Sequence, residues 1–259
     1  MCLITFAYKV HPRYRLILAA NRDEFYERPT RKAQFWAEEK QPSLLAGKDL
    51  EAGGTWMGIN TLGKWGALTN YRDPSWTRDN PPSRGELVLD FLKNKNTPKA
   101  QLHDLKEKAN IYNGFNLLLG DSRDILHYSN VNNTITEIKA GIHGVSNALL
   151  DTSWPKLNQA KENLSNVINN KNFKVEQLFE LLKNEHKPTE EELPNTGIPK
   201  EWEKAVSSVF IKSESYGTRC STLLLIDNAD KATFIERRYD PKSSVIIEEN
   251  NFQFDFLKN

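Results

Sequence analysis

The sequence predicts an α+β protein in which two antiparallel sheets are sandwiched between two helical layers, an αββα arrangement. Segments typical of strands and of helices come in blocks along the 259 residues, in the order strands, helices, strands, helices, strands. Such blocks favour antiparallel sheets, because a parallel sheet needs a crossover after each strand. The glycine-rich segments match neither GxGxxG nor GxxxxGK[ST], so no nucleotide-binding loop is expected.

The chain begins with a predicted β-hairpin. Residues 2–8 and 15–20 are apolar runs, and His11-Pro12 marks the turn between them. Antiparallel pairing about this turn places Cys2 opposite positions 21–22. Cys2 therefore faces the polar stretch Asn21-Arg22-Asp23-Glu24, and polar residues that follow an apolar strand beside a thiol are typical of a functional site.

A second hairpin and two helices are predicted next. Residues 53–60 and 63–70 form the two strands of this hairpin, with turn residues at 60–64. Ser83-Arg84-Gly85-Glu86 has the pattern of a capping box and predicts a helix start. Thr97-Pro98 predicts a second helix through about Ala109, because proline is tolerated in the first helical turn.

The rest of the chain supplies short strands, two helices and further strands. Ser153-Trp154-Pro155 begins a helix to about Ile168, and another helix covers about 175–185. Residues 187–200 are rich in Pro, Glu and Thr and are expected to form a loop that could act as a lid. The predicted strands are 114–119, 125–129, 134–138, 207–211, 221–226, 232–238 and 244–248. No repeat or linker divides the chain, so we expect one domain over residues 1–259.

Composition excludes several classes of function. The formal net charge is +1 with both signs mixed, which argues against nucleic-acid binding. No apolar run reaches the ~20 residues of a membrane span, and the N-terminus lacks the plan of a signal peptide. The 2 cysteines form no disulfide framework, which favours a cytoplasmic location. The 5 histidines have no metal-ligand spacing, so we expect no metal and no cofactor. The oligomeric state stays open.

Cys2 is the candidate nucleophile. Removal of Met1, which the small cysteine side chain permits, would leave a thiol and a free α-amine on one residue. Their reference pKa values are about 8.5 and about 7.7–8.0, so they can exchange a proton near neutral pH. In N-terminal nucleophile (Ntn) hydrolases, the first residue likewise supplies both the nucleophile and the base. The alternative is that Cys2 is only a small residue in an edge strand.

Several motifs resemble known families. Ala20-Asn21-Arg22-Asp23-Glu24 together with Cys2 resembles the NRDE, or transport-and-Golgi-organisation, family, and the resemblance covers nearly the whole chain. More distantly, the chain resembles penicillin V acylases and bile salt hydrolases, which are αββα Ntn amidases that also begin Met-Cys. The other landmarks of the NRDE family appear as Gly53-Gly54-Thr55-Trp56, Thr69-Asn70-Tyr71-Arg72, Gly144-Val145-Ser146-Asn147 and Tyr216-Gly217-Thr218-Arg219. The segments that resemble the acylase motifs are Asn21-Arg22-Asp23, Gly58 to Gly63 followed by Thr69-Asn70, Ser146-Asn147 ahead of Trp154, and Thr218-Arg219.

The acylase resemblance implies a set of roles. Cys2 would be nucleophile and base, Asp23 would hold the α-amine, and Arg219 would orient the thiolate. Asn70 and Asn147 would donate to the oxyanion, and side-chain amides are suitable neutral donors worth roughly 2.7–4 kcal/mol each. We further expect a small-molecule substrate to contact three residues, Asn21, Arg22 and Trp56, the last offering apolar surface to an acyl group.

Simpler explanations stay open for most of these residues. Asn70 and Asn147 lie near turn signals and could be turn residues. Asp23 and Arg219 could form a structural ion pair. Cys220 follows Arg219 at a strand start and is interpreted as a packing residue.

The sequence thus favours an amidase or related acyl-transfer enzyme that acts on a small apolar-acyl substrate at a non-peptide C–N bond. The alternative is a carrier of lipid or haem on the same fold that does not turn over, with Cys2 as a thiolate ligand to haem iron.

Overall fold

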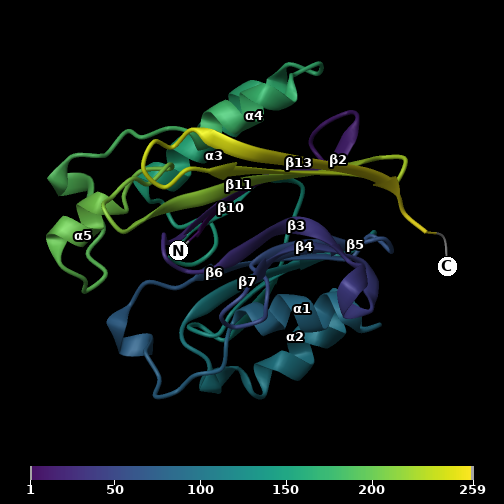
Figure 1. Ribbon diagram of the computed structural model, residues 1–259, viewed down its shortest axis with the longest axis horizontal. Helices are drawn as coiled ribbons and strands as arrows, with labels where there is room; N and C mark the ends of the chain where they lie inside the picture. The colour runs from purple at the N-terminus through teal and green to yellow at the C-terminus, as the bar shows by residue number, and fades with distance from the viewer. Residues whose placement is uncertain (1, 258–259) are drawn as a thin grey trace.

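Two antiparallel sheets lie face to face at the centre of the molecule (Figure 1). The computed structural model describes residues 2–257. Sheet A contains, in spatial order, β10 (Gly141–Val145), β1 (Cys2–Tyr8), β2 (Tyr14–Phe25), β11 (Tyr216–Asp227), β12 (Lys231–Tyr239) and β13 (Ile246–Asp255). Sheet B contains β3 (Thr30–Trp36), β4 (Gln41–Asp49), β5 (Met57–Asn60), β6 (Trp65–Asn70), β7 (Phe115–Gly120), β8 (Ile125–Ser129) and β9 (Thr134–Glu137).

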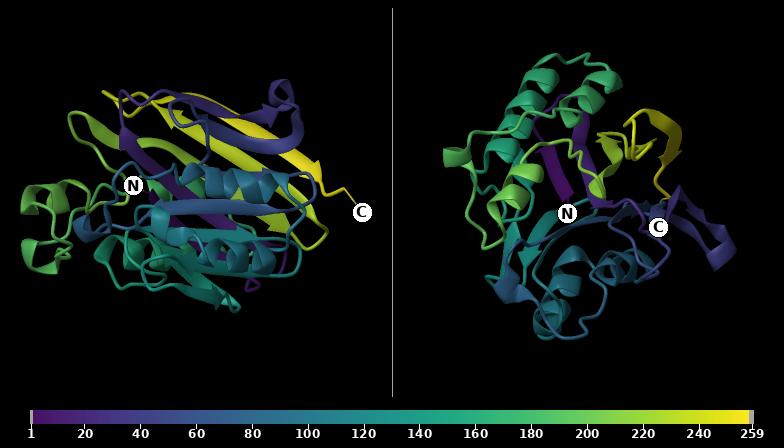
Figure 2. Two further views of the ribbon diagram at one scale, coloured as in Figure 1. Left: turned by 90° about the horizontal axis from the view of Figure 1, so that it is seen from below. Right: turned by 60° about the vertical axis from the view of Figure 1, so that its left-hand side comes forward.

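Helices cover the outer face of each sheet, which confirms the predicted αββα sandwich. Helices α1 (Gly85–Lys93) and α2 (Pro98–Lys106) pack on sheet B. Helices α3 (Pro155–Asn169) and α4 (Val175–Leu182) pack on sheet A, and the layers are seen on edge in Figure 2. A short helix, α5 (Lys200–Ala205), lies at one end of the sandwich (Figure 1). No helix of the described part is long and apolar enough to cross a membrane.

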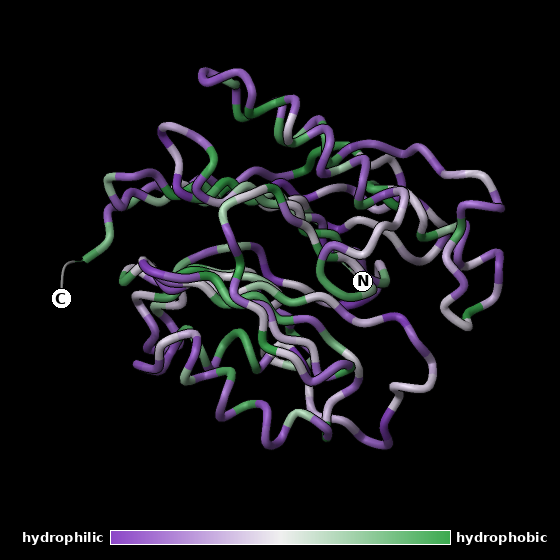
Figure 3. The backbone as a smooth tube through the Cα atoms, turned by 180° about the vertical axis from the view of Figure 1, so that it is seen from behind, coloured by the Kyte–Doolittle hydropathy of each residue, from purple (hydrophilic) through white to green (hydrophobic). Residues whose placement is uncertain are grey.

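Three apolar interfaces hold the layers together. Phe6, Trp65 and Phe234 are buried between the sheets, Phe91 lies between sheet B and its helices, and Phe179 lies between sheet A and its helices. Each buried side chain of this size contributes roughly 1.5–3 kcal/mol relative to exposure. Figure 3 shows the same pattern, with apolar segments along the inner strands and polar segments in the outer loops.

The register of the first hairpin is as predicted, with Cys2 opposite Arg22. Strand β1 is an inner strand, however, because β10 pairs with its other side. The sequence did not predict β10, whose two glycines lower its strand propensity. One of them is required by packing, since a Cβ on Gly144 would lie 2.7 Å from Cδ1 of Leu157 in α3.

The predicted starts of α1 and α2 are confirmed, and of these two helices only α2 has a side-chain cap. Thr97 Oγ1 accepts a hydrogen bond from the Ala100 backbone N–H at 3.3 Å. At α1 the capping box does not form, because the Glu86 carboxylate accepts a hydrogen bond from the Tyr112 hydroxyl instead. α1 therefore begins without the side-chain cap that the pattern indicated.

The prediction of a strand at 207–211 is wrong. This segment is irregular, although Val209, Phe210 and Ile211 are buried. Its backbone N–H groups find hydrogen-bond partners without strand pairing. The Phe210 N–H donates to the Asn184 carbonyl at 2.8 Å, and the Ile211 N–H donates to Thr218 Oγ1 at 2.9 Å. Apolar residues can thus be buried without forming a strand. Strands β3 and β4, which were not predicted, occupy one edge of sheet B, where charged residues obscure the alternation.

The other predicted elements are present with shifted ends. The predicted loop at 187–200 contains only a short 3-10 turn, Glu190–Glu192, before α5 begins. The strand expected at 221–226 begins earlier, at Tyr216, and the strand expected at 244–248 continues to Asp255.

Candidate active site

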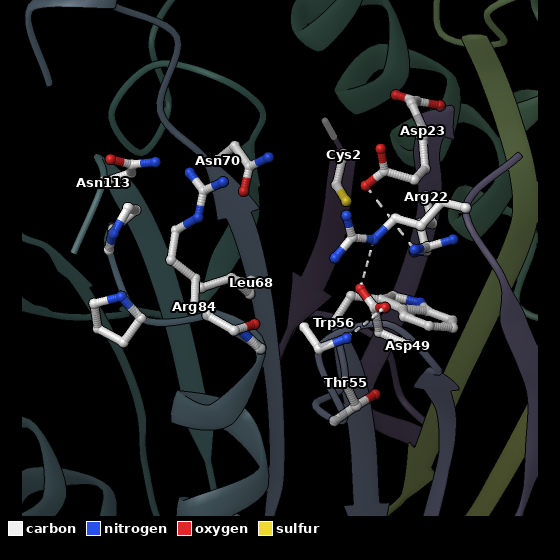
Figure 4. A pocket seen from close by; sticks show the side chains of 17 residues that line it. Cys2, Arg22, Asp23, Asp49, Thr55, Trp56, Leu68, Asn70, Arg84 and Asn113 are labelled. Carbon is white, nitrogen blue, oxygen red and sulfur yellow. Dashed lines mark hydrogen bonds and ion pairs between the residues drawn. The ribbon is translucent and has the colours of Figure 1, made fainter. Parts of the chain in front are cut away.

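A cavity of about 340 Å³ opens at the end of β1 where the two sheets meet (Figure 4). The predicted site residues that line it are Cys2, Arg22, Asp23, Trp56 and Asn70. They come from both sheets: the first three from β1 and β2, Asn70 from the end of β6, and Trp56 from the loop before β5. The hairpin register therefore brings the thiol into an open, mainly polar space.

Cys2 is fixed by its backbone, and its thiol faces the cavity. The Ser146 hydroxyl donates a hydrogen bond to the Cys2 carbonyl at 3.1 Å. Burial raises the pKa of the Cys2 thiol, the Asp23 carboxylate raises it further, and the Arg22 guanidinium lowers it. The thiol therefore needs a base near it to become a nucleophile at neutral pH.

Asp23 lies buried beside Cys2. Its Oδ1 accepts a hydrogen bond from Thr218 Oγ1 at 2.7 Å, and its backbone carbonyl accepts one from the Tyr216 hydroxyl at 2.9 Å. Burial raises the pKa of the Asp23 carboxyl to about 6, although the positive charge of Lys156 acts in the opposite direction. Thr218 of β11 thus holds the carboxyl next to the thiol, and Tyr216 of the same strand holds the Asp23 backbone.

Lys156, in the first turn of α3, is a buried cation that sequence reasoning missed. Its ammonium donates to the Val206 carbonyl at 3.0 Å and to Asn147 Oδ1 at 3.4 Å. Burial lowers its pKa to about 7, while Asp23 and Cys2 favour its charged form. Lys156 lies on the buried face of an amphipathic helix, where the pattern predicts an apolar residue. No sequence signal therefore indicated that this lysine belongs to a site.

Asn147 is the centre of a buried polar network and does not line the cavity. Its Nδ2 donates to the Asn70 carbonyl at 3.0 Å, and its Oδ1 accepts from Arg72 at 3.2 Å. Arg72 in turn forms a buried ion pair with Glu203 of α5. The amide of Asn147 is therefore engaged in holding β6, β10 and α5 together. The proposed oxyanion role of Asn70, by contrast, fits a side chain that lines the cavity.

Asn21 also lies away from this cavity. Its Nδ2 donates to the carbonyls of Leu182 and Val209, each at 2.8 Å, and its Oδ1 accepts from Ser221 at 2.6 Å. Asn21 thus ties β2 to the segments after α4. A substrate contact by this buried amide stays a prediction without geometric support.

Arg219 is not placed beside Cys2. Its Nη1 donates to the carbonyls of Phe25 at 2.7 Å and Arg28 at 3.1 Å. A β-bulge between Thr218 and Cys220 interrupts the alternation at this residue, so the spacing of the motif alone could not predict its direction. One arginine whose charge acts on the Cys2 thiol is Arg22, and the charge of Arg84 also interacts with this thiol.

Arg22 and Trp56 form a stacked pair on the cavity wall. The guanidinium carbon of Arg22 lies 4.3 Å from the centre of the Trp56 ring, and its Nη1 donates to Thr30 Oγ1 at 3.2 Å. Such stacking fixes the plane of the guanidinium group. Both residues line the cavity, and a substrate contact by them stays a prediction.

Comparison with known proteins identifies the family. The family model "Transport and Golgi organisation 2" matches residues 1–241. The chain belongs to this family. The mouse Transport and Golgi organization 2 homolog is 36% identical over 98% of this chain and 99% of its own length. The human homolog is 35% identical over 98% of this chain and 99% of its own length. The Drosophila melanogaster protein is 31% identical over 91% of each chain.

Solved structures confirm the fold class. The mutant C2A of conjugated bile acid hydrolase from Clostridium perfringens superposes with a TM-score of 0.54 and 8% identity, covering 98% of this chain and 97% of its own. A second variant of the same hydrolase superposes with a TM-score of 0.56 and 10% identity, covering 99% of this chain and 98% of its own. This likeness shows the Ntn-hydrolase fold, and at such low identity it shows the fold alone.

Sequence reasoning also missed Arg84, one of three arginines that line the cavity. Arg84 precedes α1 and faces the cavity from the side opposite Cys2 (Figure 4). Its Nη1 donates to the Gly114 carbonyl at 2.9 Å, and no carboxylate lies within ion-pair distance of it among residues 2–257. From the sequence, the capping pattern around Arg84 indicated only a helix start. The described residues contain no cluster of His, Cys, Asp and Glu that could hold a metal ion.

Proposed function

We propose that this member of the family is an N-terminal-cysteine amidase or acyl-transfer enzyme, with Cys2 as nucleophile after removal of Met1. The observation that carries the proposal is that Cys2 lines a cavity of about 340 Å³, with the buried Asp23 carboxyl beside it. A carboxylate at this position favours an α-ammonium after proton transfer from the thiol. The Ntn-hydrolase fold supports the same placement of nucleophile and base.

The chemistry requires two steps. The thiolate attacks the amide carbonyl, a C–S bond forms, and the carbonyl oxygen takes the negative charge. Collapse of this intermediate breaks the C–N bond, and the leaving amine takes the proton held by the α-amine of Cys2. Water then hydrolyses the thioester with the same amine as base. Asn70, which lines the cavity, is our candidate donor to the oxyanion.

The cavity indicates which substrate would fit. Trp56 and Leu68 give apolar surface near Cys2 for a small acyl group. Arg84, which has no carboxylate within ion-pair distance among residues 2–257, offers a positive charge across the cavity, and this charge suits an oxygen-rich or anionic end of the same molecule. We therefore propose a small amide with an apolar acyl part and a polar or anionic amine part. A cytoplasmic location stays a prediction, testable by cell fractionation.

The test begins with the state of the N-terminus. Intact mass should show loss of Met1, and limiting iodoacetamide should alkylate Cys2 before Cys220, whose side chain is buried. The protein is then screened with N-acyl amino acids and phenoxyacyl amides for release of free amine. Cys2→Ala should abolish release, and Cys220→Ala is the matched control that should retain it.

The same experiment separates an enzyme from a carrier. A carrier of lipid or haem would bind its ligand without releasing amine, both in wild type and in Cys2→Ala. Absence of Cys2-dependent amine release across the panel, in protein shown to lack Met1, would reject the amidase proposal. Haem binding through Cys2 would be seen as a Soret band that Cys2→Ala abolishes.

A further inference from the structure

A second cavity, of about 180 Å³, lies next to the first and shares its Arg22–Trp56 wall. It opens toward the ends of β11 and β12, and its polar lining includes Arg22, Arg219, Arg238, Glu236 and Tyr239. At about 30 Å³ per water molecule, this volume holds roughly six waters. It is therefore large enough for a small ion with water and too small for the ~300 Å³ and more of usual organic ligands.

Two β-bulges build this cavity. One is in β11, where Arg219 is the extra residue between Thr218 and Cys220, and the other is in β13, where Ile247 is the extra residue opposite Arg238 and Tyr239 of β12. In a regular strand, consecutive residues point to opposite faces. Here the extra residues Arg219 and Ile247 both line the cavity, together with Cys220, Arg238 and Tyr239. Bulges that re-aim side chains are common next to functional sites.

The cavity has more positive than negative charge. Arg238 pairs with Glu248 at 3.2 Å, but Lys32 pairs with the same carboxylate. Arg22 lies 4.0 Å from Glu24, and Arg219 has no carboxylate within ion-pair distance among the described residues. The carboxyl of the cavity itself, Glu236, accepts a hydrogen bond from the Ala33 N–H at 2.7 Å, and burial raises the pKa of this carboxyl.

The arginines also have unused hydrogen-bond donors. Arg219 uses only Nη1, for the Phe25 and Arg28 carbonyls, and Arg238 uses only Nη1, for Glu248. Their Nε and Nη2 atoms have no acceptor in the part of the chain that the structure describes, and these atoms are not sealed from solvent. Two neighbouring guanidinium groups with free donors match the oxygens of a carboxylate or phosphate. Burial and the nearby positive charges of Arg22 and Arg238 lower the pKa of Arg219, a repulsion that an anion would relieve.

We propose that this second cavity binds a small oxyanion, of the phosphate or carboxylate type, between Arg219 and Arg238, and that the bound anion controls Cys2 through Arg22. Arg22 belongs to both cavities and stacks on Trp56 between them. Its positive charge stabilises the Cys2 thiolate. An anion on the far side of Arg22 neutralises part of that charge, so the thiol of an occupied molecule is less reactive.

Calorimetric titration of the full-length protein tests the site. The probes are inorganic phosphate, methyl phosphate and malonate at constant ionic strength, which distinguish free phosphate, a phosphate ester and a dicarboxylate. Saturable binding of at least one probe is expected. Arg238→Gln should weaken it roughly tenfold to a hundredfold, the value of one charge-assisted contact. Arg237→Gln is the matched control, because Arg237 points to the opposite face of β12 and pairs with Glu176 and Glu249.

The outcomes that would overturn the proposal are specific. They are no binding of any probe, or equal binding by wild type and Arg238→Gln. Binding that persists in Arg238→Gln and is lost in Arg84→Gln would place the anion in the first cavity instead. If Arg238→Gln does not fold, Arg238→Lys replaces it, since lysine keeps the charge and loses the planar fork.

Coupling to Cys2 has its own measurement, independent of any hydrolysis. At a saturating concentration of the bound probe, the rate of Cys2 alkylation by iodoacetamide should fall several-fold in wild type. The rate should not respond to the probe in Arg238→Gln. An unchanged rate in wild type at saturation would overturn the control of Cys2 through Arg22.

Discussion

The buried ion pair between Arg72 and Glu203 should be among the most sensitive contacts in the protein. The two side chains are 6% and 3% exposed. Glu203 Oε1 also accepts a hydrogen bond from the Thr196 N–H at 3.0 Å, so this one carboxylate holds α5 and the preceding loop to the end of β6. Replacing it by glutamine leaves the Arg72 charge buried without its partner. Breaking a buried pair in this way costs about 3–5 kcal/mol.

Urea unfolding of Glu203→Gln measures this cost. We expect a loss near 3 kcal/mol, because glutamine keeps the size of the side chain and one acceptor. Lys204→Gln is the control: its partner Glu190 is 57% exposed, and such surface pairs are worth at most about 1 kcal/mol. A double replacement, Arg72→Met with Glu203→Leu, should recover most of the loss, since it removes both charges. A loss below about 1 kcal/mol for Glu203→Gln alone would refute the view that this pair is dry and holds α5 in place.

Three other replacements test the site and its frame. Burial raises the pKa of Asp23 from 3.8 to about 6. The contribution of this carboxyl to the free energy of unfolding is therefore fully present below pH 3.8 and is lost as the pH rises through 6. Wild type should therefore lose stability relative to Asp23→Asn between pH 4 and pH 7 in urea unfolding, whereas a constant difference would contradict the raised pKa. Asn70→Ala should fold normally and lower kcat of the amidase roughly 10²–10³-fold with KM little changed, because Asn70 lines the cavity as the candidate oxyanion donor. Asn147→Ala should instead lower the melting temperature, because the Asn147 amide bonds the Asn70 backbone and the Arg72 side chain. Gly144→Ala would place a Cβ 2.7 Å from Leu157 Cδ1 and 3.1 Å from the Ile4 carbonyl, so we expect a loss of about 1–3 kcal/mol, and wild-type stability would show that α3 can move away.

The sequence predicted what depends on local pattern. The apolar runs and the turn at His11-Pro12 were sufficient to place Cys2 opposite Arg22, because strand register follows from turn position. Helix starts at α2 and α3 followed from proline in the first turn. The sequence-based family resemblance is also confirmed.

What the sequence could not predict depends on long-range packing. Arg219 follows a bulge, and a bulge reverses which face a residue takes without leaving a clear sequence signal. Asn147 and Asn21 match motif positions, yet the carbonyls that engage them lie far away in the chain. Lys156 and Arg84 belong to helix starts, and only the tertiary structure shows that both lie near Cys2.

The position of Cys2 at the tip of an inner strand has a practical consequence for work with the purified protein. Any residues added before Cys2 would have to leave through the candidate active site, since the strand end itself forms part of the cavity wall. The last strand, β13, ends at Asp255 on the other side of the molecule (Figure 1). Affinity tags and fluorescent fusions therefore belong after the C-terminus, and an inactive preparation with an N-terminal tag would say nothing about the natural chain.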